Sequence, residues 1–274
     1  MHSLGEMPLY ATIARVRNEL DALGVSVSLS PEQVYPFDQI HYRGVDAVRD
    51  AARALELEAG EQVLDVGSGI GGPARFLAHT CGCRVTALEL QDRMHDVGRD
   101  LTERCGLSEL VTHVRGDALT HPLGEGVYDA AVSWLVIHHI PDRPRLLRRL
   151  RTALRPGGRL YVEDLCQRAP FSAADWIDVE QTLHGVTMTS ADDFVRDLRS
   201  AGFSGIVTAD MADEWSRFCA ARAAAWRAAA DRHRRVHGDE IFVALDRFFT
   251  TVQRLFESGS LGGLRIVATA GKNR

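Results

Sequence analysis

The sequence predicts an α/β fold in which a doubly wound, mostly parallel sheet carries helices on both faces. Three observations point to it. Short continuous apolar runs alternate with amphipathic stretches, which is typical of buried parallel strands joined by helices. One early run leads directly into a glycine-rich turn, VLDVGSGIGG at 63–72. The 274 residues, of which 45% are hydrophobic, are also enough to bury one large core.

Seven apolar runs are the expected strands. They cover residues 62–67, 84–90, 110–116, 128–134, 159–165, 203–209 and 264–271. Between the early strands, amphipathic stretches near 71–80, 92–105 and 142–155 predict helices. Pro156 and Gly157 follow the last of these stretches, and we expect them to end that helix before the next strand begins.

Two regions do not follow this alternation. Residues 1–58 predict an N-terminal helical arm broken near Pro31 and Pro36, and residues 166–260 are longer than a strand connection requires. Open α/β sheets bind ligands at the carboxyl ends of their strands, so both regions are candidate lids over that edge. The expected units are the arm or lid (1–58), a ligand-binding core (59–165), substrate-lid helices with the sixth strand (166–260) and the final core strand (261–274).

Composition argues against nucleic acid and membrane partners. Lys and Arg number 32 against 37 Asp and Glu, so the formal net charge of -5 does not attract polyanions. The sequence has no run of 18 apolar residues and no basic, apolar leader, which predicts a cytoplasmic protein without membrane association. The five cysteines include no C-x-x-C pair, which favours reduced thiols over disulfides or a zinc site.

The glycine-rich turn and two acidic residues indicate the kind of ligand. Gly67, Gly69 and Gly72 satisfy the G-x-G-x-x-G pattern, so a nicotinamide- or flavin-dependent dehydrogenase has to be considered. Asp65 lies near the end of an apolar strand, where a carboxylate is costly without a cationic or hydrogen-bonding partner. The ammonium group of an amino acid can be that partner, whereas a dinucleotide pyrophosphate cannot. Glu89, at the end of the second strand, can accept both hydroxyls of a ribose from either cofactor.

Five segments in order resemble the successive motifs of class I S-adenosylmethionine-dependent methyltransferases, especially those that act on small molecules. The segments are VLDVGSGIGG, ALEL, GDA at 116–118, YDAAVSWLVIHHIPD at 128–142 and LRPGGRLYVED at 154–164. The resemblance implies a Rossmann-like, seven-stranded sheet in the order 3-2-1-4-5-7-6 with the seventh strand antiparallel. It also implies S-adenosylmethionine as the cofactor.

The same resemblance assigns cofactor contacts to individual residues. In the N-terminal segment FDQIHYRG (37–44), Gln39 is expected to close over the cofactor, with Tyr35 and His41 as weaker choices. The methionine part is assigned to Asp65, Gly67, Ser68, Gly69 and Gly71, the ribose to Glu89 with Leu90 beside it, the adenine edge to Asp117 and Ala118, and the other side of the cofactor to Trp134 and Leu135.

A histidine pair after the fourth strand is the candidate catalytic site. A base is useful when the accepting atom carries a proton, and histidine suits that role near neutral pH. Neighbouring side chains of an extended chain diverge, so only one of His138 and His139 is expected to face the pocket. The segment IHHIPD resembles O-methyltransferases in which the first His is the proposed base beside an Asp after the fifth strand. This implies His138 and Asp164, and the preceding Glu163 leaves open which carboxylate points inward.

Three other histidines are interpreted as structural. His184 lies in the suspected lid and is expected at the surface. His233 and His237 have the i, i+4 spacing of two metal ligands on a helix. Their setting, DRHRRVHGDE, instead predicts a solvated charged helix without a third ligand. The sequence therefore predicts no metal site.

The resulting hypothesis is transfer of a methyl group from S-adenosylmethionine to a carbon, nitrogen or oxygen atom of a small molecule in natural-product biosynthesis. Two alternatives stay open. One is a protein that binds the cofactor without methylating, such as a cyclase or a partner subunit, and the other is an NAD(P)-dependent oxidoreductase. The sequence also leaves open the substrate and whether the arm swaps between the subunits of a possible homodimer.

Overall fold

A seven-stranded sheet in the order β3-β2-β1-β4-β5-β7-β6 forms the centre of the molecule. The computed structural model describes residues 4–11, 13–22, 24 and 28–271. Strands β1 to β5 run parallel, and β7 is antiparallel to both β5 and β6. The predicted fold class and strand order are confirmed. The strands are β1 (Gln62–Val66), β2 (Arg84–Glu89), β3 (Val111–Arg115), β4 (Tyr128–Trp134), β5 (Leu154–Gln167), β6 (Phe203–Asp210) and β7 (Leu261–Ala270).

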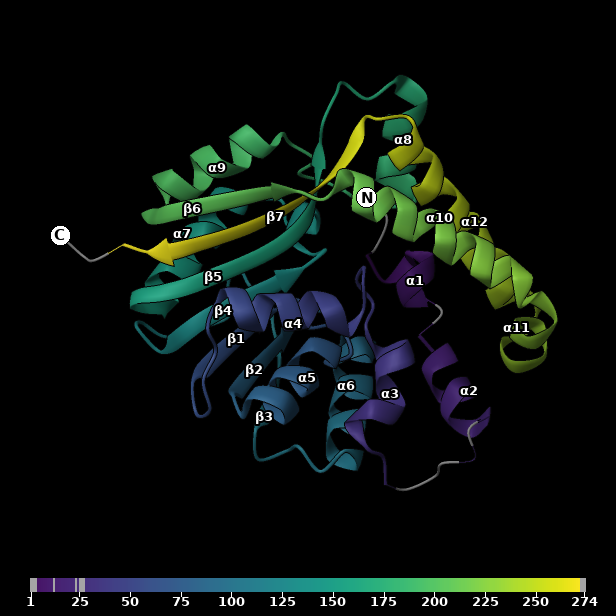
Figure 1. The fold of residues 1–274 in the computed structure, drawn as a ribbon, viewed down its shortest axis with the longest axis horizontal. Helices are drawn as coiled ribbons and strands as arrows, with labels where there is room; N and C mark the ends of the chain where they lie inside the picture. Colours follow the sequence, from purple (N-terminus) through teal and green to yellow (C-terminus); the bar gives the residue numbers. More distant parts are fainter. Residues whose placement is uncertain (1–3, 12, 23, 25–27, 272–274) are drawn as a thin grey trace.

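Helices cover both faces of this sheet (Figure 1). On one face, α4 and α5 share an apolar cluster with Val63 and Val85, and on the other, α7 and α9 belong to the cluster that includes Leu64 and Leu88. Neighbouring side chains of a strand point to opposite faces, which is why the strands read as continuous apolar runs. The helices here are α4 (Val45–Ala54), α5 (Gly72–Cys81), α6 (Asp92–Arg104), α7 (Arg143–Ala153) and α9 (Ala191–Ser200).

The boundary between α7 and β5 differs from the prediction. Helix α7 ends at Ala153 and β5 begins at once with Leu154, so Pro156 and Gly157 lie inside the strand rather than before it. Leu154 pairs with Tyr128, and the register then shifts within this part of the ladder. The proline and glycine that we expected to end the helix therefore form an irregularity in the strand.

The N-terminal segment packs across the sheet edge as a series of short helices. They are α1 (Pro8–Ala11), α2 (Arg15–Ala22) and α3 (Pro31–Asp38), preceded by a 3-10 turn at Leu4–Glu6. A fully buried ion pair holds the end of α3, because Arg75 Nη2 of α5 donates to Asp38 Oδ2 at 2.8 Å. Gly72 permits this contact, since a Cβ there would lie 2.3 Å from the carbonyl oxygen of Asp38.

Most of the 166–260 region forms a second layer beside the N-terminal segment (Figure 1). Helices α10 and α12 pack against each other, and their apolar cluster includes Trp215 and Phe248 together with Met7 and Tyr42 of the N-terminal segment. Helix α9 does not belong to this layer, because it packs on the sheet against α7. The remaining elements are α8 (Ala173–Gln181), α10 (Ala212–Ala228), α11 (Ala230–His237) and α12 (Asp239–Glu257).

The helices and the cysteines bear on two of the sequence-based expectations. Within the described ranges, none of the helices combines the length and the apolar character that a bilayer crossing requires. The five cysteines, Cys81, Cys83, Cys105, Cys166 and Cys219, are free thiols.

Removing the charge of Asp38 tests how the N-terminal segment is held. In Asp38→Asn the buried guanidinium of Arg75 loses its counter-ion, and breaking such a pair costs about 3–5 kcal/mol. We expect chemical denaturation to show a loss of this size. The matched control is Asp46→Asn, which breaks the exposed pair with Arg49 and should change the unfolding free energy by about 0.5 kcal/mol or less. Equal effects of the two variants would contradict the assignment.

Candidate active site

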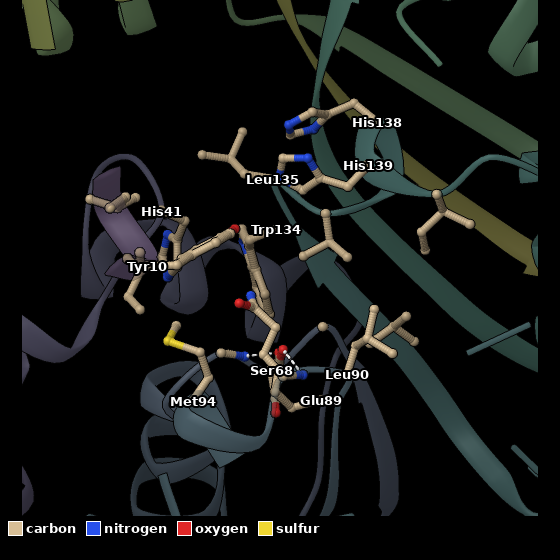
Figure 2. Close-up of a pocket in the computed structure, with 18 of the residues that line it drawn as sticks. Tyr10, His41, Ser68, Glu89, Leu90, Met94, Trp134, Leu135, His138 and His139 are labelled. Carbon is tan, nitrogen blue, oxygen red and sulfur yellow. Dashed lines mark hydrogen bonds between the residues drawn. The ribbon is translucent and has the colours of Figure 1, made fainter. Parts of the chain in front are cut away.

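A single pocket collects nearly all the predicted cofactor residues. It opens at the carboxyl ends of β1, β2 and β4, where the strand order reverses and where such sheets bind their ligands (Figure 2). The predicted residues that line it are Asp65, Gly67, Ser68, Gly69, Glu89, Leu90, Asp117, Ala118, Trp134, Leu135 and His138. Gln39 and Gly71 are the predicted cofactor residues that do not.

The glycine-rich loop is a tight turn fastened to β2. The backbone N–H groups of Gly67 and Ser68 both donate to the carbonyl of Leu88, at 2.8 and 3.0 Å. Gly67 has a φ of +70°, and a Cβ there would lie 2.4 Å from Cγ1 of Val136. We expected glycine here to admit a ligand. The structure shows an additional reason, which is that the loop after β4 packs directly on the backbone.

Asp65 is a buried carboxylate that forms no ion pair with any described residue. The side chain is 1% exposed, and its Oδ2 has no hydrogen-bond partner among the described residues. Burial, together with the nearby charge of Glu89, raises the pKa of Asp65 to about 8. A carboxylate in this state is stabilised by an incoming cation, and the ammonium group of an amino-acid ligand has the required charge.

Glu89 is fixed with both carboxylate oxygens at the pocket wall. The oxygens accept the backbone N–H groups of Gly69 and Gln91, each at 2.9 Å, as Figure 2 shows by dashed lines. Burial raises the pKa of Glu89, while these hydrogen bonds oppose the rise. Each oxygen retains a further lone pair, so the carboxylate can accept the two hydroxyls of a ribose.

The N-terminal segment reaches the pocket through His41 rather than Gln39. The ring of His41 lines the wall and stacks on Trp134 with centroids 5.5 Å apart. The side chain of Gln39 is already engaged in contacts within the N-terminal segment. Its amide nitrogen donates to Asp38 at 2.8 Å, and its Oε1 lies 2.9 Å from His41 Nε2. Tyr35 packs on Phe76 and does not line the pocket. Gln39 therefore positions a wall residue and does not form the wall.

His138 is held by Asp164 at the pocket wall. His138 Nδ1 lies 2.5 Å from Asp164 Oδ1, and Asp164 Oδ2 accepts the backbone N–H of His138 at 2.9 Å. The two side chains are 4% and 1% exposed. A carboxylate can only accept, so in a His138–Asp164 hydrogen bond of this kind Nδ1 would carry the proton and Nε2 would keep a lone pair. The pair therefore has the arrangement of a histidine base with an orienting carboxylate.

His139 also lines the pocket, contrary to the expectation that only one imidazole would face it. The reason is local backbone geometry, because Ile137–His139 forms a 3-10 turn and not an extended segment. The two imidazole centroids are 3.9 Å apart. Burial and the adjacent His138 hold the pKa of His139 well below its usual range, so this ring is neutral.

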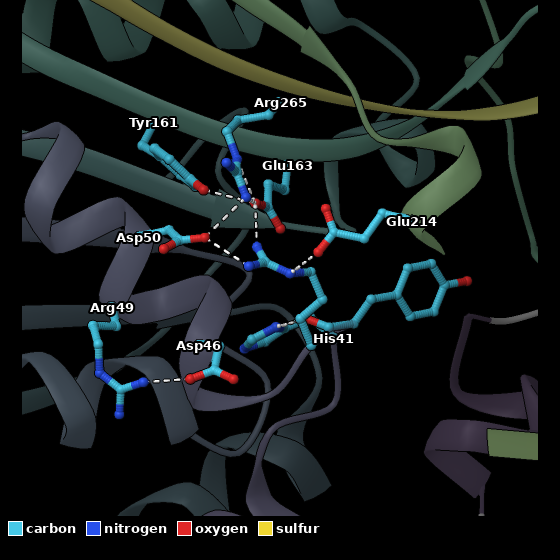
Figure 3. A network of polar contacts seen from close by, with 10 residues as sticks. His41, Asp46, Arg49, Asp50, Tyr161, Glu163, Glu214 and Arg265 are labelled. Carbon is cyan, nitrogen blue, oxygen red and sulfur yellow. Dashed lines mark hydrogen bonds and ion pairs between the residues drawn. The ribbon is translucent and has the colours of Figure 1, made fainter. Parts of the chain in front are cut away.

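Glu163 points away from the pocket into a network of charged groups. It accepts the hydroxyl of Tyr161 at 2.6 Å and Nε of Arg265 at 2.8 Å, and Arg43 lies 3.8 Å away (Figure 3). Adjacent residues of a strand face opposite sides, so Asp164 points toward His138 while Glu163 cannot. Of the two carboxylates that the sequence left open, the structure brings only Asp164 to the histidine.

The remaining histidines are more buried than the sequence suggested. His184 is buried rather than at the surface, and its carbonyl lies 3.0 Å from Nδ1 of His139. The expectation of a surface side chain was wrong because the connection between α8 and α9 packs beneath the 3-10 turn, where Val186 and Thr187 donate to the carbonyl of His138.

His233 and His237 have a carboxylate neighbour that the sequence did not reveal. His237 is buried, its Nε2 lies 3.0 Å from Glu19 of α2, and these two side chains with His233 form a group of potential metal ligands. Arg232, however, donates to both oxygens of Glu19, and His233 stacks on Trp226 at 3.8 Å. The helix that we expected to be fully solvated, α11, therefore packs against α2 through these side chains.

The sequence did not single out several other wall residues. Tyr10 of α1 lies with its ring 6.2 Å from that of His139, and Met94 comes from the first turn of α6. Arg222 and Phe248 come from α10 and α12. Helical periodicity indicates which residues are buried but not which helix reaches the sheet edge, so no local signal distinguished them.

The fold and the site together define a class of protein. An acid at the end of β2 that can accept a ribose, the buried acidic group of Asp65 and a glycine turn fit an adenosyl amino acid better than a dinucleotide, because a pyrophosphate gives Asp65 no counter-charge. The residues present therefore fit S-adenosylmethionine.

Comparisons of sequence agree with this class. Residues 64–162 match the family described as Methyltransferase domain. A sarcosine/dimethylglycine N-methyltransferase of Halorhodospira halochloris is 30% identical over 70% of this chain and 68% of its own length. A 27-O-demethylrifamycin SV methyltransferase of Amycolatopsis mediterranei is 29% identical over 79% of this chain and 80% of its own length. The chain spans only 37% of a Triticum aestivum phosphoethanolamine N-methyltransferase, at 29% identity.

Solved structures share the fold at lower identity. A phosphoethanolamine N-methyltransferase of Haemonchus contortus, in complex with phosphomonomethylethanolamine and S-adenosylhomocysteine, has a TM-score of 0.81 at 17% identity, over 94% of this chain and 60% of that chain. The cyclase SpnF has a TM-score of 0.71 at 19% identity, over 97% and 98% of the two chains.

The chain belongs to the S-adenosylmethionine-dependent methyltransferases that act on small molecules, and S-adenosylmethionine is its cofactor. The family assignment made from the motif order is confirmed.

Cofactor affinity should depend on pH through Asp65. With a pKa of about 8, this group is mostly protonated at pH 6 in the free protein and half ionised at pH 8. Because the ammonium group requires the carboxylate, S-adenosylhomocysteine should bind roughly 50-fold more tightly at pH 8 than at pH 6. Calorimetry in buffers with different ionisation heats should also detect release of a proton.

The control is Asp65→Asn, which keeps the shape of the side chain and removes its titration. This variant should bind more weakly at pH 8 and lose most of the pH dependence. An unchanged slope in the variant would assign the titration to another group.

Proposed function

We propose that the enzyme methylates a nucleophilic oxygen or nitrogen that carries a proton, with His138 as the base and Asp164 as its orienting partner. The 2.5 Å contact between the two side chains, at the wall of the cofactor pocket, is the observation that carries the proposal. Carbon nucleophiles need stronger activation than a single imidazole usually provides, so the pair favours a heteroatom.

When bound, S-adenosylmethionine supplies an electrophilic methyl group on its sulfonium. Asp65 would hold the ammonium group, Glu89 the ribose, and Trp134 with Leu135 the opposite side. Ser68 and Gly69 of the turn, with Asp117 and Ala118 after β3, complete the proposed cofactor contacts. These residues position the cofactor and exclude water, which are the main requirements of a displacement at carbon.

His138 Nε2 would accept the proton of the attacking group as the new bond forms. The charge that then develops on the imidazole lies 2.5 Å from Asp164, which stabilises it and keeps the ring in its orientation. His139, held neutral beside it, adds no competing positive charge. The chain itself forms no covalent bond to the substrate in this scheme.

A role in natural-product biosynthesis is part of the proposal. A relative that spans most of this chain is named as a 27-O-demethylrifamycin SV methyltransferase, which is an O-methyltransferase. Residues from α1, α10 and α12 line the pocket together with the sheet edge, which suits a bulky acceptor. The five free cysteines fit a cytoplasmic location.

Substitution of the two paired residues tests the base. His138→Ala and Asp164→Asn should each lower kcat by roughly 10²- to 10⁴-fold, because a positioned base contributes about that much. The affinity for S-adenosylhomocysteine should change little. His79→Ala, in an exposed pair with Glu32, serves as the histidine control and should retain activity.

Glu163→Gln distinguishes the two adjacent carboxylates. The variant loses ionic hydrogen bonds to Arg265 and Tyr161, so we expect a lower melting temperature with kcat of the folded protein preserved. A loss of turnover as large as that of Asp164→Asn would shift the catalytic assignment to Glu163.

Product mass distinguishes methylation from the alternative of a cofactor-binding cyclase. The alternative has to be tested because a solved structure with the same fold is the cyclase SpnF. A methyltransferase adds one CH₂ unit to its substrate and releases S-adenosylhomocysteine in equal amount, whereas a cyclase leaves the mass unchanged. Mass spectrometry of reactions with hydroxylated natural-product precursors therefore decides between the two.

A further inference from the structure

The described lining of the pocket includes one arginine, Arg222 of α10. Among the described residues that line the pocket, no other arginine or lysine occurs. Its surroundings come from three separate parts of the chain and are almost entirely apolar. They are Met7, Leu9, Tyr42, Leu165, Leu183 and Phe248.

Aromatic rings surround the guanidinium, and the side chains of Tyr42 and Cys219 contact it, but these groups leave two of its nitrogen atoms without a hydrogen-bond partner. The Cζ atom of Arg222 lies 5.1 Å from the ring centroid of Tyr42, 5.4 Å from that of Phe218 and 4.5 Å from that of Phe249. These cation–π contacts attract the charge but accept no N–H proton in the ring plane. The Nε and Nη2 atoms are buried and have no hydrogen-bond partner within the described part of the chain.

Within the described lining of the pocket, no carboxylate forms an ion pair with Arg222. Asp38 is paired with Arg75 at 2.8 Å, and His138 occupies Asp164 behind the wall. The other acidic side chains of the lining follow β1, β2 and β3 and belong to the proposed cofactor contacts. A desolvated guanidinium with free donors and no counter-ion is costly unless a ligand completes it.

A second arginine increases the positive potential at this end. Arg15 of α2 is half-buried, and its Nη1 donates to the carbonyl of Leu9 at 2.7 Å. Burial, and then repulsion by Arg222, lower the pKa of Arg15 to about 10. An anion placed beside Arg222 would relieve this repulsion as well as satisfy the free donors.

We infer that Arg222 binds an anionic group of the methyl acceptor, a carboxylate or a phosphate. The guanidinium offers parallel N–H donors that match two oxygens of such a group. The substrate class is therefore an amphipathic acid, in which an aromatic or aliphatic body lies on the apolar wall between the acidic group and the methylated atom. The inference rests on the proposed function, because it places the acceptor in the cofactor pocket.

Tyr42 completes the proposed anion site. It lines the pocket next to Arg222 and is 4% exposed. Burial raises the pKa of Tyr42 well above its usual range, so its hydroxyl stays protonated, and it would donate to an anion in place of its contact with the Cys219 thiol. Because the N-terminal segment supplies Tyr42 and α10 supplies Arg222, an acidic substrate would bridge these two parts of the fold.

Matched pairs of acidic and neutral probes test the inference on the full chain saturated with S-adenosylhomocysteine. The pairs are 4-phenylbutyrate with 4-phenylbutan-1-ol, and phenyl phosphate with phenol, so that the two kinds of anion are distinguished. In calorimetric titrations at least one acid should bind roughly tenfold or more tightly than its neutral partner, as expected for hydrogen bonds to a buried charged group.

Three variants assign this preference to the side chain. Arg222→Met keeps the apolar packing and should abolish the preference, and Arg222→Lys should retain part of it, because an ammonium group keeps the charge but not the two-pronged geometry. Arg217→Gln changes an exposed arginine of the same helix and should behave as the original protein does.

Thermal melting separates a binding role from a structural one. If Arg222 is kept for binding, Arg222→Met removes an uncompensated buried charge and should melt at or above the original temperature. A markedly lower melting temperature would assign Arg222 to the packing of α10 and overturn the inference. Should Arg222→Met fail to fold, the acid preference of the original protein and of Arg222→Lys still decides the question.

The outcomes distinguish this inference from the proposed function. Equal binding of acid and neutral probes, no binding of either, or a preference that survives Arg222→Met overturns the anion site alone. Loss of S-adenosylhomocysteine binding, or a product of unchanged mass, overturns the proposed function instead. Methyl transfer that depends on His138 without any acid preference would leave the proposed function standing and remove the anion site.

Discussion

The buried carboxylate of Asp65 is the constraint on which the site depends. A strand as apolar as β1 places this group beyond the reach of water, and the protein supplies no partner for Oδ2 in its described part. Free energy is therefore stored in the unliganded pocket and is released when a cation enters. The same feature explains why a glycine pattern shared with dinucleotide-binding proteins holds a different ligand here.

The order of the strands determines which side chains can meet. Because β1 lies between β2 and β4, their carboxyl ends bring Asp65, Glu89 and Trp134 to one opening. The adjacent β5 brings Asp164 to the turn after β4. The proposed cofactor contacts and the proposed base therefore come from neighbouring strands and the turns that follow them. The parts that enclose the acceptor come from the N-terminal segment and from α10 and α12, which lie outside the sheet.

Much of this arrangement could be predicted because it depends on local sequence. Apolar runs predicted all seven strands, and the ordered motifs predicted the pocket residues that follow β1, β2 and β4. The details that failed involve contacts between distant segments. Gln39 was preferred over His41 because nothing in FDQIHYRG shows that Asp38 is paired with Arg75 and draws Gln39 away from the pocket. His184 was expected at the surface because the packing beneath Ile137–His139 is not visible in its own segment.

The sequence by itself determined the sheet, the cofactor family and the acidic residues at the pocket edge that we propose hold the cofactor, since each follows from a strand and the few residues after it. Only the tertiary structure decided which of Glu163 and Asp164 reaches His138, and that Arg222 of a distant helix enters the same pocket. The physical reason is that neighbouring side chains of a strand point to opposite faces of the sheet. Which of these faces meets a histidine or an apolar cavity depends on segments far away in the chain.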